Sequence, residues 1–144
     1  MTSASVSDCI FCAIVSGAAP ASVLHEDERT VTFMDINPAT TGHALVVPKA
    51  HARDLLDISA DDLAACVAAG QRMASLMVER LGADGVNLLN SCGTAAWQTV
   101  FHFHLHVVPR YSGDPDRDSL VLPWVPAPGD PAEIARAAER LTLS

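Results

Sequence analysis

The longest regular pattern of apolar residues lies between Ser59 and Gly82. Within it, apolar or small residues recur at spacings of three and four, which places them on one face of an α-helix. These residues are Leu63, Cys66, Val67, Gly70, Met73, Ala74, Met77 and Leu81. Ser59 and Asp62 form a variant of the capping box, and glycine commonly follows the last residue of a helix. The pattern predicts a long helix over residues 60–81.

A second pattern, over residues 98–110, alternates between apolar and polar side chains and is typical of a β-strand. One face of this strand would contain Phe101, Phe103, Leu105 and Val107, and the other face His102, His104 and His106. An ordinary half-buried strand fills its polar face with residues such as threonine or lysine. Three successive histidines therefore require an explanation.

Shorter apolar runs bounded by turn residues predict four more strands, over residues 23–27, 30–35, 43–48 and 85–90. The first two are expected to form a hairpin that turns at residues 27–29. The third is apolar enough for a central position in a sheet. Strands joined by tight turns around one long helix predict an α+β fold with a mostly antiparallel sheet of about five strands.

Two shorter helices are expected near the ends of the chain. The first spans residues 8–17, with Ser7 or Asp8 as its N-cap and Gly17 just past its end. Residues 112–130 are rich in proline and aspartate and predict an extended arm that lies over the surface. A final helix is predicted over residues 131–141, because Asp130 is a suitable N-cap, a proline stands at the first helical position and an acid at the third. We expect one domain over residues 1–144, with its core in residues 8–111.

Composition narrows the classes of function. A chain that is 49% hydrophobic and 18% charged is typical of a globular protein, and it contains no apolar run long enough to cross a membrane. Its first eight residues lack lysine and arginine, so we expect no secretory signal and a cytoplasmic protein. The net charge of −8, with Lys49 as the only lysine, argues against nucleic acid as a partner. A small anion could still be bound locally.

One metal ion cannot explain all three histidines of the alternating segment. Successive residues on one face of a strand lie roughly 6.6 Å apart, so His102 and His106 would be separated by about 13 Å. Zinc holds nitrogen ligands at about 2.0–2.1 Å. A neighbouring pair can converge on one ion, but at least one histidine must have another role.

Cys9 and Cys12 lie three residues apart, on one side of the first predicted helix. Without a secretion signal, a structural disulfide is not expected. A metal half-site, a redox pair and two buried thiols remain as alternatives. His51 and His102 are candidates to complete a Cys2His2 set, which zinc binds tetrahedrally.

Five blocks of the sequence, in order, resemble the histidine triad (HIT) family of nucleotide hydrolases and transferases. The blocks are residues 9–12, residues 33–38, residues 42–51, Gln98–His102, and His102–Val108, which has the family pattern His-φ-His-φ-His-φ-φ. Together they cover about residues 8–111. The Cys-x-x-Cys element is similar to the Hint-like branch of the family.

The resemblance implies a catalytic role for four residues. His104 would attack the α-phosphorus of a nucleotide and form a nucleotidyl-histidine intermediate, which water then hydrolyses. An imidazole can do so at pH 7 because its ordinary pKa is about 6.5. His106 would contact the phosphoryl oxygens, His43 would complete the polar cluster, and Thr99 would contact the phosphate or the leaving atom.

The resemblance also implies residues that bind the nucleotide. Asp35 would bind the ribose hydroxyls and Ile36 would form part of the base pocket. Asn37 would also bind the nucleotide, and Gln98 would belong to the phosphate loop. The chain departs from the family pattern at two positions. Trp97 stands where glycine is usual and would narrow the approach to the phosphate or form a wall of the leaving-group pocket. Ser91 stands where asparagine or glutamine is often found, so one polar contact to the phosphate or ribose would be shorter or missing.

For members with the Cys-x-x-Cys element, the resemblance implies a structural Zn²⁺ bound by Cys9, Cys12, His51 and His102. It also implies a purine nucleotide or nucleotide conjugate as ligand, and a homodimer. The first expected function is hydrolysis of nucleoside phosphoramidates or adenylylated small molecules. Alternatives are a dinucleoside polyphosphate hydrolase or nucleotidyltransferase, a nucleotide-binding regulatory module with little turnover, and a metal-dependent hydrolase.

Overall fold

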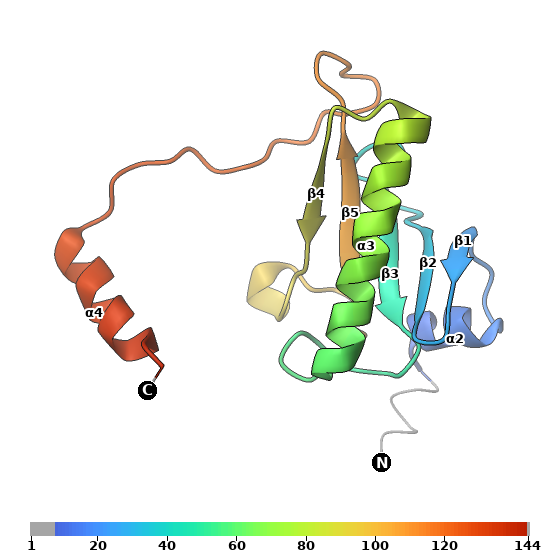
Figure 1. Cartoon of the computed structure of the whole chain (residues 1–144), viewed down its shortest axis with the longest axis horizontal. Coiled ribbons are helices and arrows are strands. Elements are labelled where there is room, and N and C mark those ends of the chain that lie inside the picture. Colours follow the sequence, from blue (N-terminus) through green and yellow to red (C-terminus); the bar gives the residue numbers. More distant parts are fainter. Residues whose placement is uncertain (1–7, 144) are drawn as a thin grey trace.

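The structure, a computed structural model, describes residues 8–143. Its strands are β1 (Val23–Glu26), β2 (Thr30–Met34), β3 (Ala44–Pro48), β4 (Gly85–Leu89) and β5 (Leu105–Arg110), and its helices are α2 (Ile10–Ser16), α3 (Ala60–Leu81) and α4 (Pro131–Leu141), with a 3-10 turn η1 (Thr94–Ala96). The strands form one sheet in the order β1-β2-β3-β5-β4, and all neighbours are antiparallel (Figure 1). The predicted α+β class and five-stranded antiparallel sheet are confirmed. No helix among the described residues is both long and apolar enough to cross a membrane.

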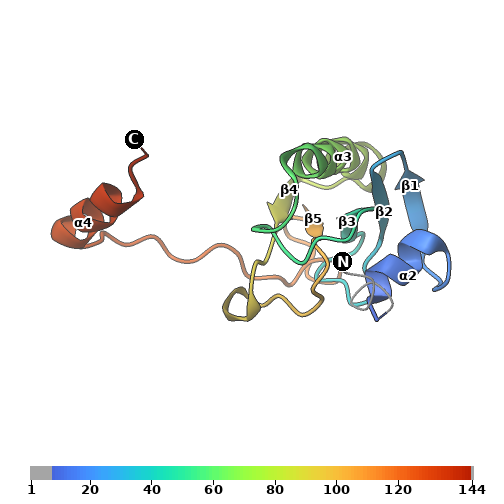
Figure 2. The ribbon, with the colours of Figure 1, turned by 90° about the horizontal axis from the view of Figure 1, so that it is seen from below.

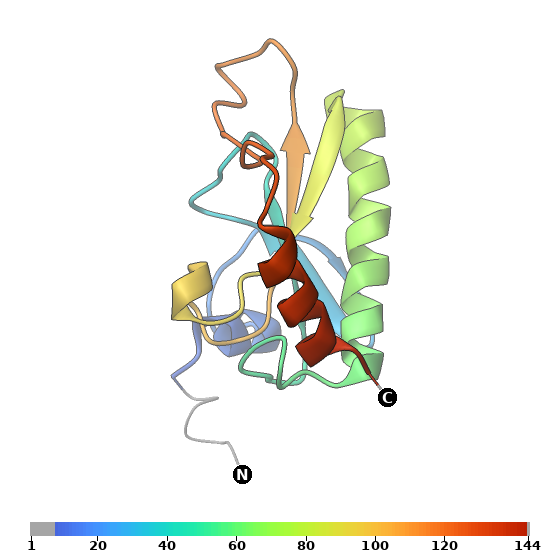
Figure 3. The same cartoon turned by 90° about the vertical axis from the view of Figure 1, so that its left-hand side faces the viewer.

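Helix α3 covers one face of the sheet (Figure 3). Its predicted bounds are confirmed, because the Ser59 side chain accepts a hydrogen bond from the N–H of Asp62 and Gly82 ends the helix with a φ of 68°. A Cβ atom on Gly70 would lie 3.0 Å from Leu105 Cδ2, so glycine allows close approach of α3 to β5. The expected apolar face was too wide. Val67 is exposed because it lies toward the open β4 edge, and Leu81 because it lies in the last turn.

The predicted hairpin and central strand are also confirmed. A carboxylate oxygen of Asp27 accepts hydrogen bonds from the N–H groups of Arg29 and Thr30, which fixes the turn between β1 and β2. Strand β3 lies between β2 and β5 and is buried throughout. Its two faces contribute to different apolar clusters, one under α3 and one that includes Phe11 of α2. Both faces of the sheet are therefore covered near its centre (Figure 2).

The prediction of a strand over residues 98–110 was wrong at its start. Strand β5 begins at Leu105, so only His106 of the three histidines lies in it. Upstream, the N–H of Phe103 donates to the carbonyl of Ala52 rather than to a neighbouring strand. The chain is drawn toward the β3–α3 connection there, and Phe101, which was expected on the apolar face, is 45% exposed. The alternation persists beyond the strand, because Phe103 packs under α3.

The predicted cap of the first helix was also wrong. Cys9 is the N-cap of α2, and its sulfur accepts a hydrogen bond from the N–H of Cys12. Asp8 does not cap the helix, and Ser7 lies outside the described residues. Gly17 ends the helix with a φ of 83°, as predicted. A thiol therefore takes the place of the usual hydroxyl or carboxylate cap.

Only the first part of the proline-rich arm lies over the surface. Asp118 forms an isolated bridge with Thr40 and an ion pair with Arg110. Beyond Leu120 the chain leaves the body past β4, and α4 stands apart from it (Figures 1 and 2). The helix has its predicted bounds, with the Asp130 side chain accepting a hydrogen bond from the N–H of Ala132.

Candidate functional site

A cavity of about 460 Å³ opens on the face of the sheet opposite α3, between the sheet and α2. Three histidines from separate parts of the sequence meet in it: His43 just before β3, His104 just before β5, and His106 within β5. Its volume falls within the usual range of small-molecule sites. It contains several titratable groups and is the candidate site of chemistry.

The hydrogen bonds of His104 leave one of its ring nitrogens free. Its Nδ1 lies 2.8 Å from the carbonyl oxygen of His102. Because a carbonyl can only accept, Nδ1 carries the proton and donates it, and Nε2 retains an unused lone pair. The backbone carbonyl of His104 is held by the Asn90 side chain at 2.9 Å, and the Phe11 ring meets the imidazole edge-to-face at 5.1 Å. The ring is thus fixed in orientation and tautomer.

His43 and His106 form a second directed contact. The N–H of Ala39 donates to Nδ1 of His43 at 2.9 Å, so this nitrogen carries no proton. The proton of the neutral ring therefore lies on Nε2, which donates to Nδ1 of His106 at 2.9 Å. His106 in turn carries its proton on Nε2. Asp35 Oδ2 lies 3.5 Å from Nε2 of His43 and adds a negative charge beside this pair.

Burial keeps the imidazoles of this cavity neutral. Desolvation lowers the pKa of His43 and of His104 below the ordinary 6.5, although Asp35 acts in the opposite direction on both. Burial, followed by the neighbouring His104 and His43, lowers the pKa of His106 to about 4. At pH 7 the histidines are therefore uncharged, and the lone pair on His104 Nε2 is available for attack on an electrophile.

Four further side chains converge beside the cavity: Cys9, Cys12, His51 and His102. The Sγ atoms of both cysteines lie 3.4 Å from Nδ1 of His102, while Nδ1 of His51 lies 3.2 Å from Cys12 Sγ and 3.2 Å from Nδ1 of His102. Tetrahedral zinc would separate neighbouring ligand atoms by about 3.3–3.6 Å. The donor set and its spacing therefore fit a metal ion.

The surroundings of this cluster support the same conclusion. Nε2–H of His102 donates to the carbonyl of Pro48 at 2.9 Å, which leaves Nδ1 free to bind a metal, as is usual for metal-bound histidines. Burial and the nearby Cys9 thiol raise the pKa of Cys12 to about 11. A bound cation would reverse that effect and stabilise the thiolate.

Asp35, His43 and His106 form a second group whose potential ligand atoms lie within 4.8 Å of one another. The bonding of His43 argues against a metal there. Its Nδ1 lone pair is occupied by the N–H of Ala39, so Nε2 carries the ring proton. To bind an ion, His43 would have to lose this hydrogen bond or become an imidazolate anion. The cysteine-containing cluster is therefore the candidate metal centre.

Among the predicted nucleotide-binding residues, Asp35, Ile36 and Asn37 line the cavity, as does Thr99. The N–H of Asn37 donates to Asp35 Oδ1 at 2.7 Å, which fixes the carboxylate at the cavity mouth. Ile36 is largely exposed and offers an apolar surface to a ligand. Asp35, Ile36 and Asn37 belong to the β2–β3 connection, whereas Thr99 lies in the loop before β5.

The structure does not bring Ser91, Trp97 or Gln98 to the cavity wall. Ser91 is buried. The side chain of Gln98 is also buried and bonds to the loop itself, donating to the carbonyls of Arg53 and Val100 and accepting from the N–H of Gly93. Gln98 thereby holds the loop that presents Thr99.

Trp97 adopts the left-handed conformation, with φ 72° and ψ 24°. Glycine tolerates this region, whereas other residues are strained in it. The indole gains no burial in return, because the residue is 82% exposed. Strain without packing is typical of a residue retained for binding.

Sequence reasoning missed three contributors to the site. Phe11, which orients His104, could have been suspected from its place between the two cysteines. The N–H of Ala39 and the carbonyl of Pro48 orient His43 and His102, but backbone groups leave no trace in residue type.

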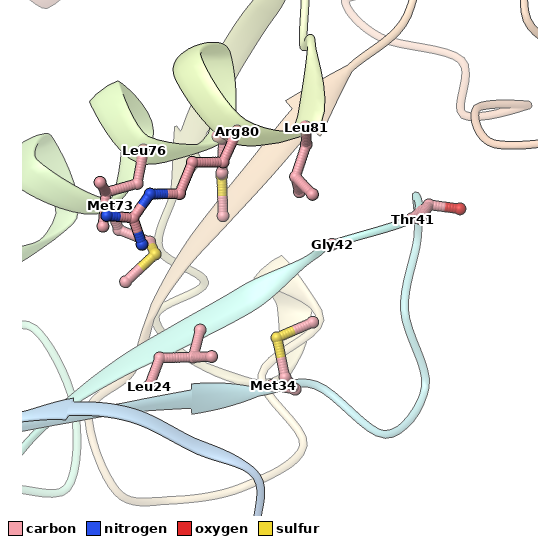
Figure 4. Close-up of a pocket in the computed structure, with 9 residues that line it drawn as sticks. Leu24, Met34, Thr41, Gly42, Met73, Leu76, Arg80 and Leu81 are labelled. Atoms are coloured by element: carbon pink, nitrogen blue, oxygen red, sulfur yellow. The ribbon is translucent and has the colours of Figure 1, made fainter.

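A second pocket, of about 380 Å³, lies on the α3 face between the last turns of α3 and strands β1 and β2 (Figure 4). Leucine and methionine side chains line it, and Arg80 is its only charged residue. No histidine, cysteine or carboxylate is among the residues that line it. The histidine cavity therefore remains the candidate for chemistry.

Comparison with known proteins agrees with this geometry. The family described as the HIT domain matches residues 16–113. An uncharacterized HIT-like protein of Mycobacterium tuberculosis is 47% identical over 106 residues, which cover 74% of this chain and 74% of that protein. A crystal structure of a zinc-bound histidine triad family protein from Mycobacterium smegmatis is 49% identical, with a TM-score of 0.74, and the match covers 81% of this chain and 86% of that chain. The adenylylsulfatase HINT3 of Arabidopsis thaliana is 36% identical over 107 residues, which cover 74% of this chain and 54% of that protein.

The family match extends from before β1 to just beyond β5 and includes all three histidines of the alternating segment. The chain therefore belongs to the histidine triad (HIT) family.

Proposed function

We propose that this protein is a nucleotidyl hydrolase that cleaves purine nucleotide conjugates at the α-phosphate. Nucleoside phosphoramidates and adenylylated small molecules are the proposed substrates. The observation that carries the proposal is the free Nε2 lone pair of His104, in a ring whose opposite nitrogen donates to a backbone carbonyl. The relative named adenylylsulfatase supports an adenylylated acid as one member of this class.

In the proposed first step, Nε2 of His104 attacks the α-phosphorus. A P–N bond forms to the histidine, the bond from phosphorus to the leaving group breaks, and an amine leaving group takes up a proton from water. The positive charge that develops on the ring is stabilised by the hydrogen bond from Nδ1–H to the carbonyl of His102. Water then cleaves the P–N bond and releases the nucleoside monophosphate.

His106 and His43 would stabilise the transferred phosphoryl group. His106 carries its proton on Nε2 and can donate it to a phosphoryl oxygen, because Nδ1 already accepts from His43. The hydroxyl of Thr99, at the cavity wall, would contact the phosphate or the leaving atom. Such directed donors are worth several kcal/mol each when they act on charge that appears in the transition state.

Nucleotide binding would use the β2–β3 connection. Asp35 Oδ2 would accept from the ribose hydroxyls, and Ile36 and Asn37 would contact the base and its edge. Gln98 and Ser91 would act through the loop and not by direct contact, since both are buried away from the cavity. Trp97, in its strained and exposed position, would contact the leaving group.

Cys9, Cys12, His51 and His102 are proposed to bind a structural Zn²⁺. Four protein ligands close the coordination shell and leave no position for a reacting water. The ion would join α2 to the segment before β5 and so support Phe11 and the backbone of His104 from one side. The zinc-bound relative from Mycobacterium smegmatis supports this choice of metal.

Self-association is the last part of the proposal. Strand β4 is an edge strand with free backbone groups on one side, and Leu88 and Leu89 on it are exposed. Val67 and Val78, on the adjacent side of α3, are exposed as well. An apolar edge of this kind favours pairing with another chain, and we infer a homodimer across it.

The central test uses an adenosine phosphoramidate with a radioactive α-phosphate. The parent protein should release labelled monophosphate, and acid-labile label should be captured on His104 in a rapid quench. His104→Asn should lower kcat by at least about 10³-fold, as expected for a missing nucleophile. His25→Asn, a change of an exposed histidine, is the matched control and should retain the activity.

The other outcomes separate the alternatives. Faster turnover of a dinucleoside polyphosphate than of the phosphoramidate would assign the second function. Tight nucleotide binding without turnover, and without label on His104, would identify a regulatory module and refute the proposed hydrolase.

A further inference from the structure

We propose that the C-terminal arm and helix α4 of one chain dock on a second copy of the chain, which binds at the β4 edge. The arm is residues 112–130, and α4 follows it. This inference deepens the homodimer proposed above and rests on it. It assigns a partner to the part of the chain that the body leaves uncovered.

The arm and helix carry apolar side chains that nothing in their own chain covers. Val121, Trp124 and Val125 are 86%, 81% and 88% exposed. On α4, Ile134 and Leu141 lie two turns apart on one face and are both exposed. An isolated helix of 11 residues is marginal in water, so α4 requires a surface against which this face can pack.

Arg110 sets the direction in which the arm leaves the body. Its Nη1 donates to Asn87 of β4 at 2.9 Å, its Nε to Asp118 at 2.8 Å, and its Nη2 to the carbonyl of Leu120 at 2.8 Å. The arm is thus tied beside β4 as far as Leu120. Beyond that residue, hydrogen bonds in the described chain join the arm and α4 only to themselves.

The arm therefore extends past β4, into the space that a second copy at this edge would occupy (Figures 1 and 2). The exposed Leu88 and Leu89 of β4 continue the apolar surface of the arm toward that space. A second copy held at the edge would lie directly under the outgoing arm. The position of the arm and the open edge thus indicate the same partner.

The available area is sufficient. The exposed apolar side chains of the arm, of α4 and of the residues that follow it are Val121, Leu122, Trp124, Val125, Ile134, Leu141 and Leu143. At roughly 100 Å² for a fully exposed aliphatic side chain and about 200 Å² for tryptophan, each weighted by its exposed fraction, they present about 600 Å². A stable protein–protein interface buries about 800 Å² on each partner, and the β4 edge would supply the remainder.

Photo-crosslinking in the full chain tests which surface α4 contacts. Ile134→p-benzoylphenylalanine places the probe on the apolar face, and Ala132→p-benzoylphenylalanine places it on the opposite face as the matched control. Each variant is mixed with an equal amount of ¹⁵N-labelled chain. The proposal expects products of twice the chain mass that join labelled to unlabelled chains, with a yield at least fivefold higher from position 134.

Crosslinks confined to one chain would overturn the proposal, as would equal yields from the two positions. Binding of the helix to vesicles of anionic phospholipid, with no crosslink between copies, would assign the apolar face to a membrane surface and would also overturn it.

Sedimentation provides a second measurement. Ile134→Glu should raise the dissociation constant of the dimer at least tenfold relative to Ala132→Glu, which adds the same charge on the other face. Equal dissociation constants would contradict the docking of α4. Nucleotide turnover is measured with the His104→Asn variant, and dimer formation is measured by sedimentation. The failure of one proposal is therefore distinguishable from the failure of the other.

Discussion

The burial of His106 makes the folded protein less stable at low pH. Burial lowers its pKa from the ordinary 6.5 to about 4 in the folded protein. Below pH 6.5 the unfolded chain binds a proton that the folded protein does not, so the free energy of unfolding falls as the pH falls toward 4. The full shift corresponds to a loss on the order of 3 kcal/mol.

We therefore expect His106→Asn to lose less stability than the parent protein between pH 7 and about pH 4.5. The measurement is the free energy of urea unfolding at each pH, compared as a difference so that lost contacts cancel. His25→Asn should follow the parent protein, because His25 lies on the exposed strand β1. A pH dependence of His106→Asn identical to that of the parent would contradict the assignment.

Trp97 is a residue at which stability and binding are opposed. Its left-handed backbone conformation suits glycine, and its exposed side chain adds no packing. Trp97→Gly should raise the free energy of unfolding by about 0.5–1 kcal/mol, after the greater flexibility of glycine in the unfolded chain is subtracted. The same change should raise KM for substrates with large aromatic leaving groups and leave small ones unaffected.

Ala96→Gly, one residue upstream, is the control for this prediction. It has no positive φ to relieve, so the added glycine should only lower stability. If Trp97→Gly left KM unchanged for every leaving group, Trp97 would have no role in binding the leaving group.

At the scale of elements, the proposed zinc would join three segments that are far apart in the sequence: the start of α2, the β3–α3 connection and the chain before β5. A ligand that binds only the folded state contributes about 4 kcal/mol at a thousand times its Kd. For a domain of this size that corresponds to roughly 10–20 °C in Tm. Removal of zinc by a chelator should lower Tm by this amount.

Cys12→Ser should have the same effect and should abolish the bound zinc measured by elemental analysis. Cys92→Ser, at another half-buried free cysteine, should retain both metal and Tm. A chelator that removes the metal without change in Tm would show that the ion does not stabilise the fold.

The elements that sequence predicted best are those whose ends are set by local residues. Helix α3 begins and ends where Ser59 and Gly82 indicate, because each acts within a few residues of itself. The start of β5 was missed, since it depends on the carbonyls of Pro48 and Ala52, about fifty residues upstream. No periodicity records such distant hydrogen bonds.

The candidate site was predictable to a similar extent. The spacing of Cys9 and Cys12 identified them as candidate ligands, and the residue type of the alternating histidines identified them as candidate site residues. That the Gln98 side chain faces inward depends on its hydrogen bonds to the Arg53 and Val100 carbonyls. These contacts exist only once the loop has folded, so residue type could assign Gln98 to the loop but could not give the direction of its side chain.

For the whole molecule, Arg110 links the sheet to the arm and should control assembly. Arg110→Lys keeps the charge but cannot reach Asn87, Asp118 and Leu120 together, because an ammonium lacks the planar fork of a guanidinium. In the parent protein the Leu120 amide donates to Asp118. In Arg110→Lys we expect faster hydrogen exchange of this amide and a dimer dissociation constant raised severalfold.

Arg136→Lys on α4 is the control for Arg110→Lys and should change neither quantity. Unaltered exchange at Leu120 in Arg110→Lys would mean that the arm is held in place by other contacts.

The N–H of Ala39, which donates to His43, has a consequence for mutation of the site. The backbone N–H of residue 39, and not the Ala39 methyl group, determines which nitrogens of His43 and His106 carry the protons. Nineteen amino acids supply that donor equally well, and only proline lacks it. The chemistry thus depends on position 39 but not on the side chain there. Ala39→Pro, next to the proline at position 38, is the one replacement that removes the donor, and a single nucleotide change produces it.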